Sequence, residues 1–421
     1  MRARDAAGGG VTGPGVGASA APRRTAAAPR RPRVVVVAEY YPRVADPVLG
    51  GWAHRQALAA RDAGAVVRVL VLHRPVPSYA ALRRRRPAEL VAPLRQPLHT
   101  RINGLRVTYV PFLAPPRPRS YSSWGRYAAP PLALALRALR ARFPFDLVHA
   151  HYAAPAGDAV LRARIDVPLV VSVHGGDAYG VAEDGPDGLA AVTRALSGAR
   201  IVIAHSGGVA DRCRVLGAGD VRVVHLGTDV PDRRAREFET PTLVTVGHLV
   251  ARKRQADVVR ALWVLRDLDP PPRLVIVGDG PERPALERLA AELGLADRVE
   301  LRGQLAPADA RAVAQRGTVF VLPSVDEAFG VAYVEAMAGG VPAVGSRGEP
   351  GPEEIAATGG GLRHVAPGDP VALAAELRTL LTDAPFRRQL ADEARATVAA
   401  SFTWEACGRE TVAAYAAALD A

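Results

Sequence analysis

The chain has 421 residues, of which 49% are hydrophobic and 23% charged, a composition that predicts a folded protein with room for two domains. Its formal net charge is +12, but the first 33 residues hold seven arginines and one aspartate, so much of the excess lies outside the expected folded body. The two cysteines, Cys213 and Cys407, are too few for a disulfide framework or a cysteine zinc site and fit a reducing cytoplasm. No run approaches the length of a transmembrane helix.

Two basic segments stand out. Residues 1–32 are rich in Gly, Ala, Pro and Arg and lack the apolar block of a signal peptide, so we expect a disordered basic tail on a cytoplasmic protein. The second segment is Arg83–Arg86. No nucleic-acid-binding module accompanies either, so nucleic acid is not expected as a partner. A solvated loop in an arginine-rich chain and a patch for an anionic membrane surface or acceptor both remain open for Arg83–Arg86.

From residue 33 the chain alternates between short apolar runs and longer helical segments. The run RVVVVAEYY at 33–41 is typical of a strand buried on both faces of a parallel sheet. Residues 50–65 predict a helix and 66–73 the next strand. Further strands are predicted at 145–152, 168–175 and 199–206. This order indicates βαβ units and an open α/β sheet.

A charged, proline-containing segment at 229–242 interrupts the pattern and indicates a domain boundary. A second α/β series follows, and the last stretch, 386–420, predicts a helix. Strands of the second series are predicted at 243–249, 273–280, 298–304, 318–324 and 341–346. The expected fold class is therefore α/β, with two Rossmann-like domains over 33–230 and 241–400 that face a cleft at the carboxyl ends of their strands.

Two glutamates, Glu327 and Glu335, lie in an otherwise small and apolar stretch, PSVDEAFGVAYVEAMAGG at 323–340. Glu327 is expected in a strand-to-helix turn and Glu335 about two turns along the helix. Phe329, Gly330 and Val331 would form the helix N-terminus, whose free N–H groups and dipole attract an anion. An anion seat flanked by two acceptors for sugar hydroxyls fits a nucleoside diphosphate-sugar. The alternative is structural, with Glu327 complementing the helix dipole and Glu335 paired with an arginine.

Lys253 is the only lysine in the chain, since every other strongly basic side chain is an arginine. It follows the predicted strand that ends at Gly247, and its compact ammonium suits a phosphate group. The alternative is an exposed basic loop shared with Arg252 and Arg254. A glycine pair, Gly50–Gly51, forms a second candidate phosphate loop, but without the GxGxxG spacing of dinucleotide-binding proteins.

Two further loops follow predicted strands. His174 and Asp177 in VVSVHGGDAY would lie at the cleft, where a histidine can bond a sugar hydroxyl or be satisfied by backbone. Gly278 and Asp279 lie in a turn before a helix that Pro281 is expected to start, and this loop would overlook the same cleft. The pair His149 and His151 lacks a third ligand, so no metal site is expected.

Five motifs in this order resemble the retaining nucleotide-sugar glycosyltransferases of family 4, which have the GT-B fold. The resemblance covers residues 33 to 418, and its most specific part is the pair of glutamates eight residues apart. The other motifs are VGHLVARKR, LVIVGDGPERPALERLA, HGGD and VVHLGTD. The stretch GSRGEPGPEEIAATGGG is similar to a bacterial subgroup that makes cell-surface polysaccharides, including teichuronic-acid-type polymers.

The resemblance implies roles for these residues. Glu327 would contact donor-sugar hydroxyls, Glu335 ribose hydroxyls and Lys253 the diphosphate, while His174 would face the transferred sugar. Sugar and diphosphate would lie by the backbone of Phe329–Val331 and by Gly50–Gly51. Residues 33–230 would bind the acceptor and 241–400 the donor, and 401–421 would be a helix that crosses back to the first domain, with the crossover at 402–405. One departure is His248, where many members have arginine, so Arg252 or Arg254 is expected to help neutralise the diphosphate.

The expected activity is metal-independent transfer of a hexose, with retained configuration, to a sugar, lipid-linked or small-molecule acceptor. Another enzyme of the same fold, such as an epimerase or phosphorylase, remains an alternative. A catalytically silent partner that docks on membranes is a second alternative, although it would have no need of Glu327, Glu335 and Lys253. An NAD-dependent oxidoreductase is disfavoured because its glycine fingerprint is missing.

Overall fold

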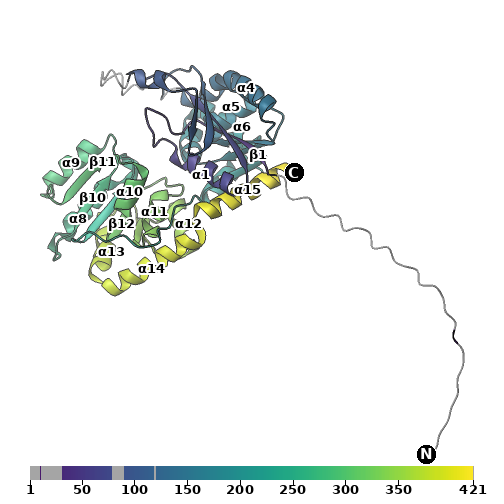
Figure 1. Cartoon of the computed structure of the whole chain (residues 1–421). Helices are drawn as coiled ribbons and strands as arrows, with labels where there is room; N and C mark the ends of the chain where they lie inside the picture. The colour runs from purple at the N-terminus through teal and green to yellow at the C-terminus, as the bar shows by residue number, and fades with distance from the viewer. Residues whose placement is uncertain (1–9, 11–30, 78–89, 118–119, 421) are drawn as a thin grey trace, which may run out of the picture. The chain divides into compact units, whose positions relative to one another are not determined.

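The computed structural model describes residues 10, 31–77, 90–117 and 120–420 (Figure 1). The basic run Arg83–Arg86 and nearly all of the expected tail lie outside the described residues. The described residues from Pro32 onward form one compact unit that contains two separate β-sheets. Within the described residues, no helix is long and apolar enough to cross a membrane.

The first sheet has eight strands in the order β3-β4-β2-β1-β5-β6-β7-β8. All neighbours are parallel except β3, which pairs antiparallel with β4 at the edge. The four consecutive valines of β1 are fully buried because helices cover both faces of the sheet. The strands are β1 (Arg33–Ala38), β2 (Val66–His73), β3 (His99–Ile102), β4 (Leu105–Pro111), β5 (Leu147–His151), β6 (Leu169–Ser172), β7 (Ile201–Ala204) and β8 (Val221–Val223).

Side chains of β1 alternate between two apolar cores. Val35 and Val37 pack on the face that is covered by α4 to α7, whereas Val34 and Val36 pack on the face that is covered by α1 and the C-terminal helix α15. The helices of this half are α1 (Gly51–Asp62), α4 (Trp124–Arg142), α5 (Asp158–Ala163), α6 (Gly185–Ser197) and α7 (Gly207–Val215).

The second sheet has six parallel strands in the order β11-β10-β9-β12-β13-β14. Its two faces are likewise covered, one by α8, α9 and α13 and the other by α10, α11 and α14. The elements are β9 (Thr242–Val246), α8 (Gln255–Val264), β10 (Arg273–Val277), α9 (Arg283–Glu292), β11 (Val299–Gly303), α10 (Pro307–Ala314), β12 (Val319–Leu322), α11 (Val331–Ala338), β13 (Ala343–Ser346), α12 (Pro350–Thr358), β14 (Leu362–Val365) and α13 (Pro370–Thr382).

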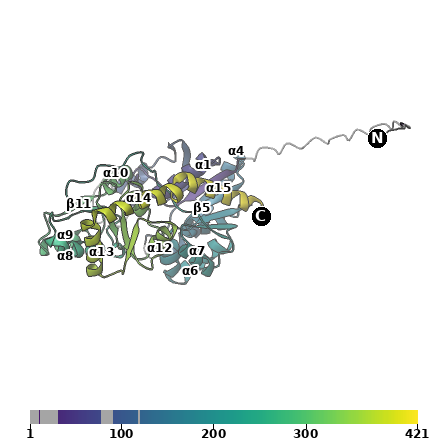
Figure 2. The same ribbon diagram turned by 90° about the horizontal axis from the view of Figure 1, so that it is seen from below.

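The helix predicted over 386–420 is two helices, α14 (Ala384–Ser401) and α15 (Trp404–Asp420) (Figure 2). The chain breaks between them because Phe402 is buried in a core of the second sheet, whereas Tyr415 is buried in a core of the first. At the break, Thr228 donates its backbone N–H to the carbonyl oxygen of Phe402. From there α15 packs along α1 of the first half (Figure 1).

Several boundaries differ from the predictions. The first strand ends at Ala38 rather than at residue 41, and α9 begins at Arg283, two residues after Pro281. Strands β3, β4, β8 and β14 were not predicted. Both β3 and β14 are edge strands with partly exposed polar side chains, so they lack the continuous apolar run of the central strands.

Candidate functional site

Glu327 and Lys253 form a buried ion pair. Glu327 lies in the loop between β12 and α11, and Lys253 ends a short helical turn, Ala251–Lys253, that follows β9. The Lys253 ammonium donates to the Glu327 carboxylate, and the side chains are only 11% and 10% exposed. The Ser324 hydroxyl donates to the same carboxylate at 2.9 Å. The interpretation of Lys253 as an exposed basic residue is therefore wrong.

The electrostatics of Glu327 fit a permanently charged acceptor. Burial is the largest single influence and would raise its pKa, but Lys253, Arg252 and the Ser324 hydroxyl together outweigh burial and lower the pKa below its ordinary value. The backbone N–H of Glu327 donates to the Glu349 carboxylate at 2.9 Å, which fixes the loop. Glu327 is thus held as an ionised carboxylate in one orientation.

Glu335 is partly buried on α11 and differs from Glu327 in having no neutralising partner. Among the described residues, no side chain forms a hydrogen bond or ion pair with its carboxylate, and Arg311 pairs instead with Asp229, at 3.7 Å. The interpretation of Glu335 as one half of an arginine ion pair is therefore wrong. Burial raises the pKa of Glu335 to about 7, only partly offset by the charge of Arg311. Its oxygens are available to hydroxyl donors of a ligand.

The start of α11 matches the predicted anion seat. Gly330 is the N-cap residue with a φ of 83°, in the left-handed region, and Val331 is the first helical residue. The Phe329 side chain is buried in the core of the second half, which anchors the helix N-terminus. The sequence prediction for these three positions thus has its expected local structure, whereas ligand contact stays a prediction.

The second predicted phosphate loop, Gly50–Gly51, lies at the start of α1. Gly50 has a left-handed φ of 64°, and a Cβ there would collide with the backbone carbonyl of Tyr40. No atom lies within 4 Å of a Cβ built on Gly51, so the space beside it is open. A residue larger than glycine is excluded at Gly50, and a ligand has room to approach at Gly51.

The remaining predicted donor residues follow β9 and β10. His248 and Arg252 are exposed, and among the described residues the Arg252 guanidinium donates only to the carbonyl oxygen of Asp326, at 3.3 Å. Gly278 packs against the Gly247 carbonyl, and the exposed Asp279 side chain accepts the Gly280 N–H at 2.8 Å. Arg254 instead pairs with Asp257, at 2.7 Å, so of the two expected arginines Arg252 is the one available to an anion.

In the first half, the HGGD turn after β6 is organised by Asp177. Its fully buried carboxylate accepts the backbone N–H groups of Ala153 at 2.8 Å, His174 at 3.0 Å and Ala178 at 3.2 Å. Burial raises the pKa of Asp177 to about 6, although these hydrogen bonds pull it back. Asp177 therefore ties the loop after β5 to the loop after β6 and is a positioning residue.

His174 belongs to a group of four neighbouring histidines at the ends of β5, β6 and β7. Its Nε2 bonds His151 Nδ1 at 3.0 Å, and its ring lies 4.7 Å from that of His205 and 5.3 Å, stacked, from that of Tyr152. Burial and the neighbouring imidazoles lower the pKa of His174 well below its ordinary value. The ring is therefore neutral at physiological pH, which suits a hydrogen bond to a hydroxyl rather than a charge contact.

His149 and His151 form hydrogen bonds to other buried or partly buried side chains. His149 bonds the Tyr415 hydroxyl on α15 and the Ser172 hydroxyl, both at 2.8 Å. Within the described part of the chain, no group of three or more His, Cys, Asp or Glu side chains could hold a metal ion.

The HGGD turn touches the Glu327 loop directly. Gly175 has a left-handed φ of 88°, and a Cβ there would lie 2.5 Å from Ala328 Cβ. The Ser206 hydroxyl donates to the Ala328 carbonyl at 2.8 Å, in a fully buried contact. The structure therefore brings together the two sets of residues that the sequence placed in different domains.

Sequence reasoning missed several neighbours of this site. Ser324 and Glu349 hold Glu327, while Trp52 and His205 border His174, with the Trp52 ring 5.9 Å from it. Glu349 had a detectable signal, because it immediately precedes Pro350 and forms the N-cap position of α12. Ser324 and His205 lie in loops after strands and Trp52 lies at the start of α1, and their approach to the site depends on tertiary contacts.

Comparison with solved structures shows the fold. Sucrose-phosphate synthase from Thermosynechococcus elongatus superimposes with a TM-score of 0.74 at 22% identity, covering 92% of this chain and 98% of that one. HepE from Anabaena, in complex with UDP and glucose, superimposes with a TM-score of 0.68 at 18% identity, covering 91% and 99%. Two Rossmann-like domains with these neighbours define a GT-B glycosyltransferase architecture.

Sequence comparison gives the family. Residues 52–231 match the model of Glycosyltransferase Family 4, and residues 231–397 match that of Glycosyl transferases group 1. A D-inositol 3-phosphate glycosyltransferase of Stackebrandtia nassauensis is 32% identical over 326 residues, which cover 68% of this chain and 71% of that protein. The chain therefore belongs to the family 4 glycosyltransferases.

Other relatives match over shorter stretches. The lipopolysaccharide core biosynthesis glycosyltransferase LpsD of Rhizobium meliloti is 34% identical over 40% of this chain, and an MMP alpha-(1->4)-mannosyltransferase of Mycolicibacterium hassiacum is 35% identical over 41%. These alignments span 49% and 39% of the length of the two relatives.

Proposed function

We propose that the chain is a retaining glycosyltransferase that moves a hexose from a nucleoside diphosphate-sugar to an acceptor hydroxyl, in the cytoplasm, during synthesis of a bacterial cell-surface polysaccharide or glycolipid. The observation that carries this proposal is the contact between the HGGD turn and the Glu327 loop. This contact joins the turn that carries the neutral His174 to the loop that carries Glu327, the ion-pair partner of Lys253.

Lys253 and Glu327 would bind different parts of the donor, Lys253 the diphosphate and Glu327 the sugar. The lysine ammonium has three donor hydrogens, and Glu327 can occupy one of them, which leaves donors for diphosphate oxygens. The exposed Arg252 and His248 and the N-terminus of α11 supply further donors for the same anion. Glu327, whose charge is kept by Lys253, would accept from hydroxyls of the sugar that is attached to this diphosphate.

Glu335 and His174 would contact the two ends of the donor, the ribose and the transferred sugar. The unpaired carboxylate of Glu335 would accept both hydroxyls of the ribose. His174, neutral because its surroundings are buried, would bond a hydroxyl of the transferred sugar. The Gly50–Gly51 loop, open beside Gly51, would leave room for the diphosphate.

In the reaction, the bond between the anomeric carbon and the diphosphate oxygen breaks while the acceptor oxygen bonds to the same face of that carbon. The acceptor proton passes to an oxygen of the departing phosphate, so no enzyme-bound sugar intermediate is required. Lys253 and Arg252 stabilise the charge that develops on the leaving diphosphate, by preorganised electrostatics. We propose that these fixed positive groups make a metal ion unnecessary.

The relatives support this assignment without fixing the substrates. HepE has been solved with UDP-glucose, and one relative from Mycobacterium tuberculosis, 34% identical over 45% of this chain, is named a GDP-mannose-dependent phosphatidylinositol dimannoside mannosyltransferase. The donor of this chain is accordingly proposed as a nucleoside diphosphate-sugar, with the base open. Its acceptor is proposed as a sugar, a lipid-linked sugar or a small hydroxyl compound.

Calorimetric titration with UDP, GDP and ADP tests the proposal. We expect one nucleotide to bind at micromolar strength, and we expect Lys253→Ala and Glu335→Ala each to weaken that binding about ten-fold or more. Lys253→Arg is a charge-retaining control and should bind more tightly than Lys253→Ala. Glu292→Ala, which removes an exposed carboxylate at the end of α9, should bind like the unchanged protein.

The titrations also separate the alternatives. Absence of binding to all three nucleotides, in protein shown to be folded by circular dichroism, would favour a catalytically silent partner. Binding that neither substitution weakens would place the donor site elsewhere. With the bound base known, NMR of the product distinguishes retention from inversion, and a product formed without acceptor would indicate an epimerase. Transfer that EDTA abolishes would overturn metal independence.

A further inference from the structure

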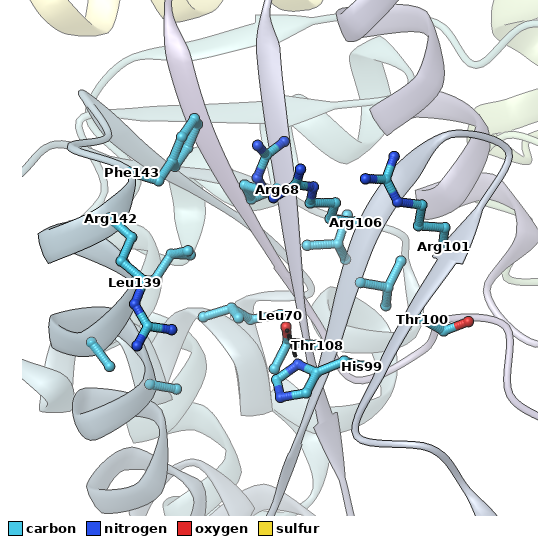
Figure 3. Close-up of a pocket in the computed structure, with 14 residues that line it drawn as sticks. Arg68, Leu70, His99, Thr100, Arg101, Arg106, Thr108, Leu139, Arg142 and Phe143 are labelled. Atoms are coloured by element: carbon cyan, nitrogen blue, oxygen red, sulfur yellow. Dashed lines mark hydrogen bonds between the residues drawn. The ribbon is translucent and has the colours of Figure 1, made fainter.

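A cavity of about 680 Å³ lies in the first half between the β2-β4-β3 edge of the sheet and the C-terminal part of α4 (Figure 3). Its strand residues come from the amino-terminal halves of β2 and β4, beginning with Arg68 and Arg106. The candidate donor site lies at the carboxyl ends of the parallel strands. The cavity therefore lies toward the opposite end of these strands and is not part of the donor site.

Three arginines form one row across three neighbouring strands. In the register of the sheet, Arg68 of β2 is paired with Arg106 of β4, and Arg106 is paired with Arg101 of β3. Residues directly opposite each other project to the same face, and Figure 3 shows the three guanidinium groups beside one another at the cavity. Like charges that are paired across strands destabilise a sheet, so this row opposes folding unless an anion neutralises it.

No carboxylate of the described protein neutralises the row. None of the lining residues is Asp or Glu, and within the described residues none of the three row arginines forms an ion pair. In the described part of the chain, the Arg68 guanidinium donates only to the carbonyl oxygen of Val67, at 3.3 Å. Arg142, the last residue of α4, also lines the cavity and has no ion pair in that same part of the chain. Four guanidinium groups thus surround one space that lacks a negative charge.

The rest of the cavity is largely apolar, although His99, Thr100 and Thr108 of β3 and β4 also line it. Leu70, two residues after Arg68 on the same face of β2, and Leu139 of α4 line the cavity beside the arginines. The Phe143 ring closes one side, with the Arg68 guanidinium 4.9 Å from its centre. Because the cavity combines a cationic row with an apolar floor, a small inorganic anion alone would leave most of it unfilled. Its volume lies within the range of pockets that bind organic ligands.

From this arrangement we infer an anion-binding site for a phosphate or diphosphate ester that carries an apolar group. Its charged oxygens bond the guanidinium groups of Arg68, Arg101 and Arg106, which offer the paired donors that phosphate groups prefer. Its apolar part lies on Leu70, Leu139 and Phe143. The ligand is either a soluble phosphate ester or the phosphate headgroup of a lipid.

Thermal unfolding of the full chain with and without inorganic pyrophosphate tests the site. Without the anion, we expect Arg106→Gln to raise the melting temperature by about 1–2 °C, since it removes the central charge of the row. With pyrophosphate, the unchanged protein should gain stability and Arg106→Gln should gain much less, because its affinity falls about ten-fold. Arg288→Gln, which removes an exposed arginine of α9 in the other half, should behave like the unchanged protein.

Two further arms assign the ligand and its position. Pyrophosphate binding that Lys253→Ala abolishes and Arg106→Gln leaves intact would belong to the donor site and would overturn the inference. Vesicles of phosphatidylcholine with phosphatidic acid, compared with phosphatidylcholine alone, test the lipid source. Binding to the acidic vesicles that Arg106→Gln reduces supports a headgroup, and pyrophosphate binding without vesicle binding supports a soluble ester. Failure of both probes to respond to Arg106→Gln would overturn the site.

Discussion

Lys253 illustrates how one residue type is selected by its surroundings. The chain uses arginine at every other strongly basic position, yet the side chain beside Gly247 and against Glu327 is lysine. An arginine presents a planar fork of five donors, whereas an ammonium is compact and can turn its three donors toward different partners. A buried site that must serve both a carboxylate and a diphosphate favours the smaller, adaptable cation.

Glu335 should leave a pH signature in stability. Burial raises its pKa to about 7, compared with an ordinary value of 4.5. Between these values the unfolded chain releases the proton and the folded chain keeps it, so the folded state loses stability as pH rises through this window. We expect the free energy of unfolding, relative to Glu335→Gln, to fall by about 3 kcal/mol between pH 4.5 and 7.5. Urea unfolding of both proteins across this range measures it.

The critical result is whether the free energy of unfolding of the unchanged protein, relative to that of Glu335→Gln, falls or rises with pH. A difference that does not change with pH would mean that the Glu335 carboxylate is well solvated, and one that rises with pH would mean that the carboxylate is paired with a cation. Glu292→Gln, which removes an exposed carboxylate, controls for the change in net charge.

Packing between helices fixes the position of α15. Gly408 of α15 lies directly against the backbone carbonyl of Ala59 in α1, so a Cβ at this position would collide with main-chain atoms that cannot turn away. Tyr415, about two turns further along, is fully buried and bonds His149. The close approach at Gly408 is therefore a condition for burying Tyr415.

Gly408→Ala separates helix propensity from packing. In an exposed helix, alanine would stabilise the protein by up to about 1 kcal/mol relative to glycine. Against the Ala59 carbonyl, we expect the opposite sign, a loss of about 2 kcal/mol. Chemical unfolding followed by circular dichroism gives the answer. Ala413→Gly, on an exposed position of the same helix, measures the propensity alone, and a gain in stability for Gly408→Ala would refute the packing account.

The elements that the sequence predicted well are those with a strong local signal. The buried valine run of β1 and the apolar core strands of the second half can be recognised from their composition alone. The β3–β4 hairpin was missed although its Asn103–Gly104 turn, with φ angles of 47° and 83°, is a strong hairpin signal. The hairpin was not recognised because the sequence of β3 is polar, as an edge strand does not need an apolar run.

The candidate site was predictable only in part, for a related reason. Lys253, Glu327 and Glu335 stood out as charges in apolar or arginine-rich surroundings, which a single sequence can show. The contact of Lys253 with Glu327 joins residues 74 positions apart, and the contact of Ser206 with Ala328 joins residues 122 positions apart. Such pairings depend on how the sheets and loops pack, and no local pattern in the sequence reports them.

Glu354 makes two of the polar contacts that join the two halves. Its carboxylate accepts the Gly207 backbone N–H at 2.9 Å and bonds His225 Nε2 at 2.8 Å, so one side chain of α12 holds two segments of the first half. The His225 hydrogen bond outweighs burial and lowers the pKa of Glu354. Glu354 therefore stays ionised near neutral pH and keeps both contacts.

Glu354→Ala should loosen this junction without unfolding either half. We expect the Gly207 amide hydrogen to exchange with solvent about ten-fold faster, since the lost hydrogen bond was its protection. Hydrogen exchange read by mass spectrometry or NMR resolves the segment. Glu353→Ala is the matched control, because Glu353 accepts the Gly348 N–H within the second half. Equal exchange at Gly207 in both variants would show that Glu354 does not hold the junction.

A chain with one lysine has one place at which lysine-directed chemistry can act. A protease that cleaves after lysine has a single target bond, and a reagent that acylates the lysine side chain has a single target amine. Both targets lie inside the candidate site, where the amine is charged, held by Glu327 and only 11% exposed. The speed of cutting or labelling at this position would therefore report, in unmodified protein, how often the loop around Lys253 opens and whether a ligand keeps it shut.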